Sequence, residues 1–289
     1  MQKKFDQNLS IFLSDIHVSG KEVAGQPVYQ NPLFVNAVDQ ILAMDPLPAR
    51  VVIFGDISLW KGLSADYEES MDELNRIRDA GIDLILTLGN HDHRDSFFRY
   101  HPESLERSPV PGRAAATVDL GTLDLFLLDS LKEIGDEGGW NAVEGILDEA
   151  QAEWLCKAAA ESKRPFIIGS HHPPCELRIN GKDIRATFED NPNFVGYVYG
   201  HKHQWIKNWY HSGYSKRHVT REVCVPSTGW WGTIGFAIMR SYEDRAVVSL
   251  KQSDFFFPSP LKEGEERPRE WDEIFRENEG DYCTFSYRN

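Results

Sequence analysis

Five short polar motifs in this sequence each follow directly on an apolar run of strand length. Their members are aspartate, asparagine and histidine, often beside a glycine, and no cysteine stands among them. Carboxylate and amide oxygens and neutral imidazole nitrogens are donors suited to zinc, manganese and iron, so these residue types predict a metal site. The motifs are Asp15-Ile16-His17, Gly55-Asp56, Gly89-Asn90-His91-Asp92, His171-His172-Pro173 and Gly200-His201-Lys202-His203.

Two of these motifs place two candidate ligands one residue apart. On an extended backbone, alternate side chains point the same way. Asp15 and His17 could therefore bind one ion together, and so could His201 and His203. The neighbouring glycines, of which Gly89 is one, would let the backbone turn sharply and approach closely.

Each motif has an ordinary explanation when it is taken alone. A Gly-Asp pair such as Gly55-Asp56 after a strand is most often only a turn. A single buried histidine such as His171 is more often a hydrogen-bonded core residue than a ligand. The occurrence of all five motifs at strand ends is what makes coincidence a poor explanation.

The elements that must position these motifs can be read from the apolar pattern. Nearly continuous apolar runs are expected to be strands that are buried on both faces. They cover residues 9–13, 51–54, 84–88, 123–128, 166–168 and 195–199. Helical patterns lie between them at 31–44, 66–80 and 148–161. This alternation favours an α/β architecture, in which ligands bind at the carboxyl ends of the strands.

The pattern changes after residue 219. Shorter apolar runs at 222–225, 234–240 and 246–250 are expected to be antiparallel strands that close a sheet. We expect a domain over residues 1–254. A charged arm over 255–289 follows, and its spaced aromatic residues predict packing against its own domain or against a second copy, which leaves a homodimer open.

Composition excludes some partners and compartments. The chain has 31 basic and 45 acidic residues, a net charge of −14, which disfavours nucleic acid over most of the surface. The first apolar run is only strand length, so neither a signal peptide nor a membrane helix is expected. The four cysteines show no paired spacing, which favours reduced thiols and a cytoplasmic location.

The five motifs, taken in chain order, resemble the signature of the calcineurin-like metallophosphoesterases. The resemblance spans roughly residues 11–235. Two stretches, residues 91–94 and 171–174, are most similar to the bacterial branch of cyclic-nucleotide and glycerophosphodiester phosphodiesterases. The resemblance implies a four-layer α/β/β/α sandwich of two mixed sheets flanked by helices.

The resemblance also implies a ligand set for two divalent or trivalent ions, which could be manganese, iron or zinc. His171 is preferred over His172 because the family's ligand lies two residues before the proline. The segment after Asp56 departs from the family, since residues 57–60 lack its frequent second acidic or asparagine residue. The implied ligands are Asp15, His17 and His203 for one ion, Asn90, His171 and His201 for the other, and Asp56 as the bridge.

The expected function is hydrolysis of a small-molecule phosphate ester by attack of a metal-bridging hydroxide, most plausibly on a phosphodiester such as a cyclic nucleotide or glycerophosphodiester. His91 would assist the leaving group, and Arg94 and Lys202 would contact substrate. Four tryptophans could offer an aromatic face to a base, although core packing is the commoner role for each: Trp205, Trp209, Trp230 and Trp231. The alternatives are a protein phosphatase or nuclease of the same fold and a non-catalytic binding scaffold, which is ranked last because no ligand is missing.

Overall fold

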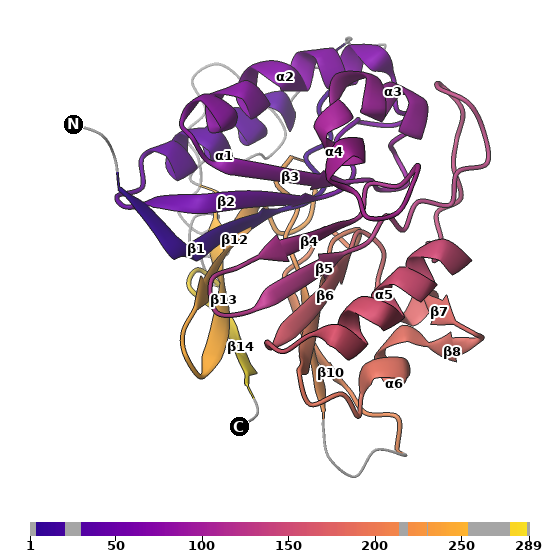
Figure 1. Cartoon of the computed structure of the whole chain (residues 1–289). Helices are drawn as coiled ribbons and strands as arrows, with labels where there is room; N and C mark the ends of the chain where they lie inside the picture. The colour runs from indigo at the N-terminus through magenta and orange to yellow at the C-terminus, as the bar shows by residue number, and fades with distance from the viewer. Residues whose placement is uncertain (1–3, 21–29, 214–218, 230, 254–277, 288–289) are drawn as a thin grey trace.

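The computed structural model describes residues 4–20, 30–213, 219–229, 231–253 and 278–287. Two six-stranded sheets lie face to face, and helices cover their outer sides (Figure 1). This arrangement confirms the predicted α/β/β/α sandwich of two mixed sheets.

The first sheet is built around three parallel strands that carry three of the polar motifs. Strand β1 pairs in parallel with β2, and β2 pairs in parallel with β3. The other three strands continue the sheet in antiparallel fashion on the far side of β1. The order is β14 (Tyr282–Ser286), β13 (Arg245–Gln252), β12 (Gly235–Ser241), β1 (Phe5–Leu13), β2 (Leu47–Phe54) and β3 (Asp83–Thr87).

The second sheet carries the remaining two motifs. Its central strands β5, β6 and β9 are parallel, and β11 joins β9 in parallel as well. Antiparallel strands stand at both edges. The order is β10 (Ile206–Tyr210), β11 (Thr220–Cys224), β9 (Phe194–Tyr199), β6 (Phe166–Ser170), β5 (Asp124–Leu127) and β4 (Ala116–Asp119).

Residues that alternate along a strand separate into different layers of the sandwich. In β1, Phe12 packs between the two sheets, whereas Ile11 and Leu13 face the helices. In the second sheet, Leu125 lies between the sheets and Phe126 faces the outer helical layer. Because successive strand residues point to opposite faces, a strand buried on both faces needs the continuous apolar run that the sequence shows.

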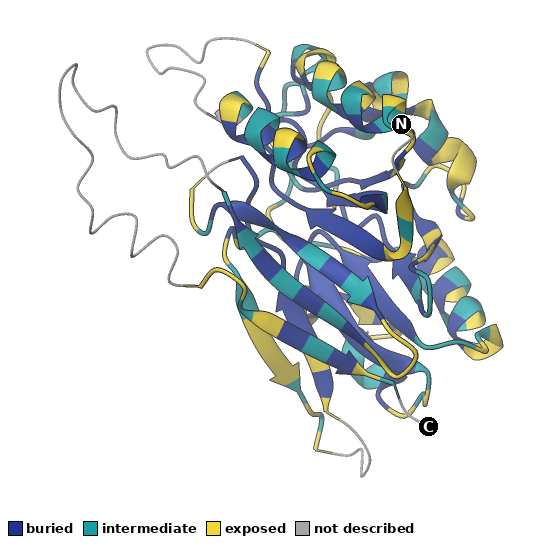
Figure 2. Ribbon diagram, turned by 90° about the vertical axis from the view of Figure 1, so that its left-hand side faces the viewer, coloured by how far each residue is buried: buried dark blue, intermediate teal, exposed yellow. Residues whose placement is uncertain are grey.

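Helices on each side complete the sandwich. The first sheet is covered by α1 (Gln30–Leu42), α2 (Ser64–Asp79), α3 (Arg94–Tyr100) and α4 (Pro102–Arg107), and the second by α5 (Glu149–Glu161) and α6 (Ile184–Phe188). The strands are largely buried, while the helices show alternating buried and exposed stripes (Figure 2). A short hairpin of β7 (Arg178–Ile179) and β8 (Lys182–Asp183) lies beside α6.

The late strands depart in part from expectation. Strands β12 and β13 are antiparallel in the first sheet, as predicted. Strand β11 instead joins the second sheet and is parallel to β9, so the chain crosses between sheets after it. The edge strands β4 and β10 were not predicted, because four or five residues at an edge carry little apolar signal.

Part of the segment expected to be a C-terminal arm belongs to the first sheet. Strand β14 pairs antiparallel with β13. Its Phe285 is fully buried between the sheets, and a Cβ on Gly196 would come within 2.2 Å of the Phe285 ring. The rest of that segment, 254–277, lies outside the described residues. Among the residues that the structure does describe, no helix is long and apolar enough to cross a bilayer.

Replacing Phe285 should weaken the join between the sheets. Phe285→Ala is expected to lower the free energy of unfolding by about 3–5 kcal/mol, because it leaves a cavity in the inter-sheet layer. The melting temperature should fall by roughly 10 °C in a thermal denaturation measurement. Tyr282→Ala is the matched control, since Tyr282 stands in the same strand but is 60% exposed. Equal, small changes in both variants would contradict the structural role of β14.

Candidate metal centre

Five loops converge at the carboxyl ends of strands from both sheets. Each candidate residue lies within a few residues of the end of its strand. Asp15 and His17 follow β1, Asp56 follows β2, Asn90 and His91 follow β3, His171 follows β6, and His201 and His203 follow β9.

One group of buried side chains forms around His17 and His203. Their Nε2 atoms lie 3.2 Å apart. The Asp15 Oδ1 atom lies 3.3 Å from His203 Nε2 and 3.9 Å from His17 Nε2. The Asp56 Oδ2 atom lies 3.8 Å from His17 Nε2. These four side chains are mutually close enough for their donor atoms to hold one ion.

A second group forms around His171. Its Nε2 atom lies 3.2 Å from His201 Nδ1, 3.2 Å from Asn90 Oδ1 and 3.2 Å from Asp56 Oδ2. The same carboxylate oxygen of Asp56 thus belongs to both groups, which is the arrangement that a bridging ligand requires. The structure therefore brings together all seven residues that the sequence predicted as ligands.

His172 lies beside this second group, within reach of a shared ion with His171 and His201. Its Nδ1 atom is hydrogen-bonded to the Ser130 hydroxyl at 2.8 Å. Its Nε2 atom is buried and has no hydrogen-bond partner among the described residues. Asn90 Oδ1 lies 3.2 Å from His171 Nε2, and the choice of Asn90 over His172 as a ligand stays a prediction.

The backbone that holds the ligands is not extended, contrary to the expectation for the Asp-x-His and His-x-His pairs. Side-chain convergence comes instead from a left-handed backbone, which is uncommon outside glycine and clusters at functional sites. Backbone hydrogen bonds hold it there: Asp15 donates to the Gly55 carbonyl at 3.1 Å, and His17 donates to the Asp56 carbonyl at 3.0 Å. The φ angles are 52° at Asp15, 48° at His17, 52° at Asp56, 69° at His201 and 53° at His203.

Two glycines permit the close approach of these loops. A Cβ on Gly89 would lie 2.2 Å from Asp56 Oδ1, and a Cβ on Gly200 would lie 1.8 Å from the Ser14 hydroxyl oxygen. Any side chain at either position would displace a ligand loop. The need for glycine follows from lack of space.

The pKa values of the histidines are shifted in the same pattern in both groups. Burial lowers the pKa of His17 and of His201 to about 3. Burial also acts against the charge of His171, but Asp56 outweighs it and raises the pKa of His171 to about 9. Asp15 likewise raises the pKa of His203 against its burial. In each touching pair, the pKa of one imidazole is lowered and that of the other is raised.

The donor set fits metal ions. Burial disfavours ionisation of Asp15 and Asp56, but the nearby His203 and His171 hold the pKa of each carboxyl below its usual value. Asp15 Oδ1 is buried without a hydrogen-bond partner in the described part of the chain. A cation held by Asp15 and its neighbours would satisfy this oxygen, and its binding would require unprotonated ligand histidines, because ligands bind metal in their deprotonated form.

His91 lies over this cluster and does not join either group of donors. Its backbone N–H donates to Asp56 Oδ1 at 2.8 Å, and its Nε2 atom lies 3.9 Å from Asp56 Oδ2. Asp92 points elsewhere: its buried carboxylate accepts hydrogen bonds from the Ile57, Ser58 and Gly89 N–H groups and from the Tyr67 hydroxyl. Asp92 thus braces the loops and does not orient the His91 ring.

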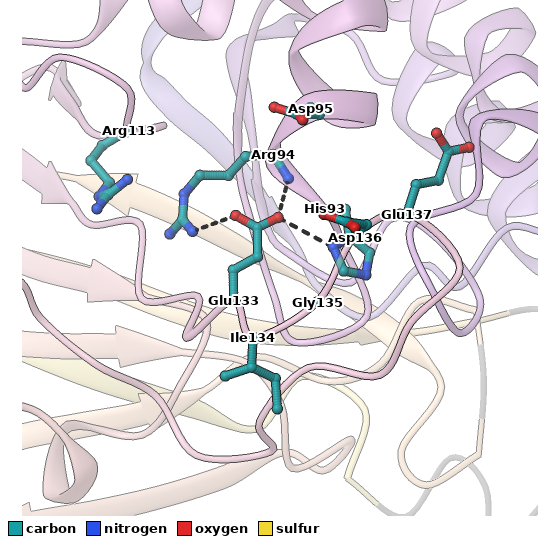
Figure 3. A pocket seen from close by; sticks show the side chains of 9 residues that line it. All are labelled: His93, Arg94, Asp95, Arg113, Glu133, Ile134, Gly135, Asp136 and Glu137. Carbon is teal, nitrogen blue, oxygen red and sulfur yellow. Dashed lines mark hydrogen bonds and ion pairs between the residues drawn. The ribbon is translucent and has the colours of Figure 1, made fainter.

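Arg94 and Lys202 differ in how far they are available to a substrate. The guanidinium of Arg94 is paired with Asp129 at 2.8 Å and with Glu133 at 3.0 Å. Figure 3 shows Arg94 and His93 turned toward Glu133 in a pocket of about 480 Å³. Arg94 therefore holds the loop after β5, which argues against its predicted contact with substrate. Lys202 is 45% exposed, and its Nζ atom lies 3.8 Å from Glu176.

Sequence analysis missed two of the tryptophans beside the site. The ring centroids of Trp60 and Trp140 lie 5.8 Å and 6.2 Å from that of His91. Of the four tryptophans considered earlier, Trp231 stacks on His203 at 4.6 Å. Trp205 instead donates to Asp281, Trp209 is exposed on β10, and Trp230 lies outside the described residues. The one sequence signal for Trp60 was that residues 57–60 differ from the family's usual pattern.

Comparison with known proteins agrees with this geometry. Residues 10–205, more than half of the chain, match the family model of the calcineurin-like phosphoesterases. The chain belongs to this family. The family resemblance that the sequence motifs predicted is thereby confirmed.

Individual relatives in this family show how far the similarity extends. A probable cyclic nucleotide phosphodiesterase of Rhodopseudomonas palustris is 31% identical over 163 residues, which cover 53% of this chain and 53% of that protein. The chain thus matches about half the length of this curated relative.

Two solved structures share the fold of this calcineurin-like phosphoesterase. A dimetal phosphatase of Danio rerio has a TM-score of 0.62 and 15% identity, covering 96% of this chain and 98% of its own. A purple acid phosphatase of yellow lupin, Lupinus luteus, has a TM-score of 0.57 and 14% identity, covering 85% of this chain and 51% of its own. At these identities the similarity establishes the fold alone.

Removing the shared carboxylate should cost more metal than removing a carboxylate that serves one group. Protein purified without chelator should contain about two equivalents of transition metal by elemental analysis. Asp56→Ala should lose more of this metal than Asp15→Ala. Asp72→Ala, at an exposed position on α2, should lose none. Equal metal contents in the Asp56 and Asp15 variants would refute the bridging role, and no metal after reconstitution would refute the centre.

Proposed function

We propose that this phosphoesterase hydrolyses a small-molecule phosphodiester with two metal ions held by the seven convergent side chains. The observation that carries the proposal is the position of Asp56 Oδ2, 3.2 Å from His171 Nε2 and 3.8 Å from His17 Nε2. One carboxylate oxygen between two groups of nitrogen and oxygen donors is the arrangement of a dinuclear centre.

The two groups divide the donors evenly between the ions. Asp15, His17 and His203 would hold one ion, and Asn90, His171 and His201 the other, with Asp56 shared. When bound, two such ions supply an acidified water as nucleophile and neutralise charge on the phosphoryl oxygens. The chemistry is compatible with manganese, iron or zinc.

His91 has the position of a group that assists the leaving oxygen. Its side chain is 15% exposed, and its Nδ1 atom has no hydrogen-bond partner among the described residues. The backbone hydrogen bond to Asp56 fixes the residue beside the bridging ligand while its ring stays outside both donor groups. A proton donated from this ring to a departing alkoxide would remove the main remaining difficulty of the reaction.

A small diester is favoured over larger substrates by two observations. The Rhodopseudomonas palustris relative is named as a probable cyclic nucleotide phosphodiesterase. The net charge of −14 acts against binding of a polyanionic nucleic acid. Lys202, exposed between two ligand histidines, is proposed to attract the phosphate.

Activity on two chromogenic esters would test the proposal. Reconstituted protein should hydrolyse bis(p-nitrophenyl) phosphate with a higher kcat/KM than p-nitrophenyl phosphate, and chelation should abolish both activities. A preference for the monoester would overturn the diester assignment. Absence of hydrolysis of both esters by metal-loaded protein would overturn the proposed function.

Loss of His91 should affect the chemical step and leave the metals in place. His91→Ala is expected to reduce kcat by about 10²–10⁴ on a diester with an alkyl leaving group. The reduction should be smaller on an aryl ester, because its leaving group departs without a proton. Steady-state kinetics with parallel elemental analysis would measure both effects. Equal losses on the two esters would exclude proton donation, and a fall in metal content would make His91 a ligand.

A further inference from the structure

Two tryptophans form a wall beside His91 that the dinuclear chemistry does not require. Their ring centroids lie 5.7 Å apart with the ring planes at 79°, in an edge-to-face arrangement. Both rings also contact His91, at 5.8 Å for Trp60 and 6.2 Å for Trp140. Trp140 is 55% exposed. An aromatic surface beside His91 is therefore accessible to solvent.

The position of Trp140 is set by anchors on both sides of it. Gly138 donates its N–H to the Lys61 carbonyl at 3.0 Å, and the Gly139 carbonyl lies 3.1 Å from His93 Nε2. On the other side, the Asn141 side-chain amide donates to the Asn90 and Asp92 carbonyls at 3.3 Å and 2.7 Å. Trp140 is thus tied to the loops that carry Trp60 and the His91 motif.

The side chain of Lys61 also contacts the wall of two tryptophans. Lys61 Nζ lies 5.1 Å from the centre of the Trp140 ring. A lysine over one face of an indole makes a cation–π interaction, which helps to hold the ring in place. An exposed tryptophan fixed by its neighbours loses little conformational entropy when a ligand packs against it, so the wall is prepared for binding.

We propose that Trp60 and Trp140 form a subsite for an aromatic ring carried by the leaving group of the ester, such as a nucleobase. The proposal deepens the function above and rests on the role of His91: a group attached to the oxygen that His91 protonates meets these two rings. Aromatic rings pack favourably in offset or edge-to-face contact, and base–tryptophan stacking tolerates any base. Trp140 is then a specificity-determining residue.

A matched pair of cyclic phosphodiesters separates this subsite from the chemistry. Adenosine 2′,3′-cyclic phosphate carries a base, and glycerol 1,2-cyclic phosphate offers a similar reacting ring without one. The metal-loaded protein should prefer the adenosine ester. Trp140→Ala should lower kcat/KM roughly 5- to 100-fold on that ester, and change it less than about twofold on the glycerol ester. Trp140→Phe should retain most of the preference.

The matched control is Trp209→Ala, because Trp209 is 66% exposed on the edge strand β10. This variant should behave as the parent protein on both esters. Equal losses on the two esters in Trp140→Ala would overturn the subsite, since they would indicate damage to the reacting centre. No loss on the adenosine ester would overturn it as well.

Binding without turnover distinguishes failure of the subsite from failure of the proposed function. Calorimetric titration of the metal-loaded protein with adenosine 5′-monophosphate should give a Kd that rises roughly 5- to 100-fold in Trp140→Ala. The Kd for ribose 5-phosphate should stay unchanged. If neither cyclic ester is hydrolysed but this difference appears, the subsite stands and the proposed diesterase activity fails. An unchanged Kd for the adenosine ligand overturns the subsite itself.

Discussion

A carboxylate removed from water is costly unless positive or polar partners surround it, and this requirement organises the molecule around Asp56. Its Oδ2 atom lies within 3.2–3.9 Å of imidazole nitrogens of His171, His17 and His91, and its Oδ1 atom accepts the His91 N–H. Asp56 and these three histidines come from loops after four different strands. The strand order, the left-handed turns and the missing side chain at Gly89 all serve to bring these partners to one oxygen.

Hydrogen bonds of neighbouring residues hold the loops around Asp56 in place. Asp92, whose pKa burial and the nearby Asp56 raise to about 6, ties three backbone N–H groups and the Tyr67 hydroxyl into one buried network. Left-handed backbone at non-glycine residues costs on the order of 1–3 kcal/mol each and persists only where the surroundings enforce it. The Asp92 network and the hydrogen bonds between the Asp15 and Asp56 loops supply that enforcement.

Much of this was predictable because the strands that carry the site are buried on both faces. An apolar run such as 51–54 predicts a strand without knowledge of its partners, and the polar residues at the strand ends predicted a metal site, while the individual ligands were implied by the family resemblance. The edge strands β4 and β10 could not be predicted, because alternate residues of β4 are exposed and none of the residues of β10 is buried. Trp140 could not be placed either, because it is far from His91 in the chain and hydrogen bonds of its neighbours Gly138, Gly139 and Asn141 bring it there.

Arg94 shows that the place of a residue beside a motif does not determine which partners its side chain contacts. Asp129 and Glu133 lie more than thirty residues away in the chain, and they engage its guanidinium. Arg94 is close to His91 in the sequence, but the contacts of a side chain depend on the direction in which it points. Arg94 is the first residue of α3, and its side chain turns toward Glu133 in the loop after β5.

The division of donors between the two sheets has a mechanical consequence. Several contacts between donors cross from one sheet to the other: His17, after β1, meets His203, after β9, and Asp56, after β2, meets His171, after β6. Ions bound there would link the two sheets to each other at the carboxyl ends of their parallel strands. Any slide of one sheet past the other would therefore change the arrangement of ligands around both ions.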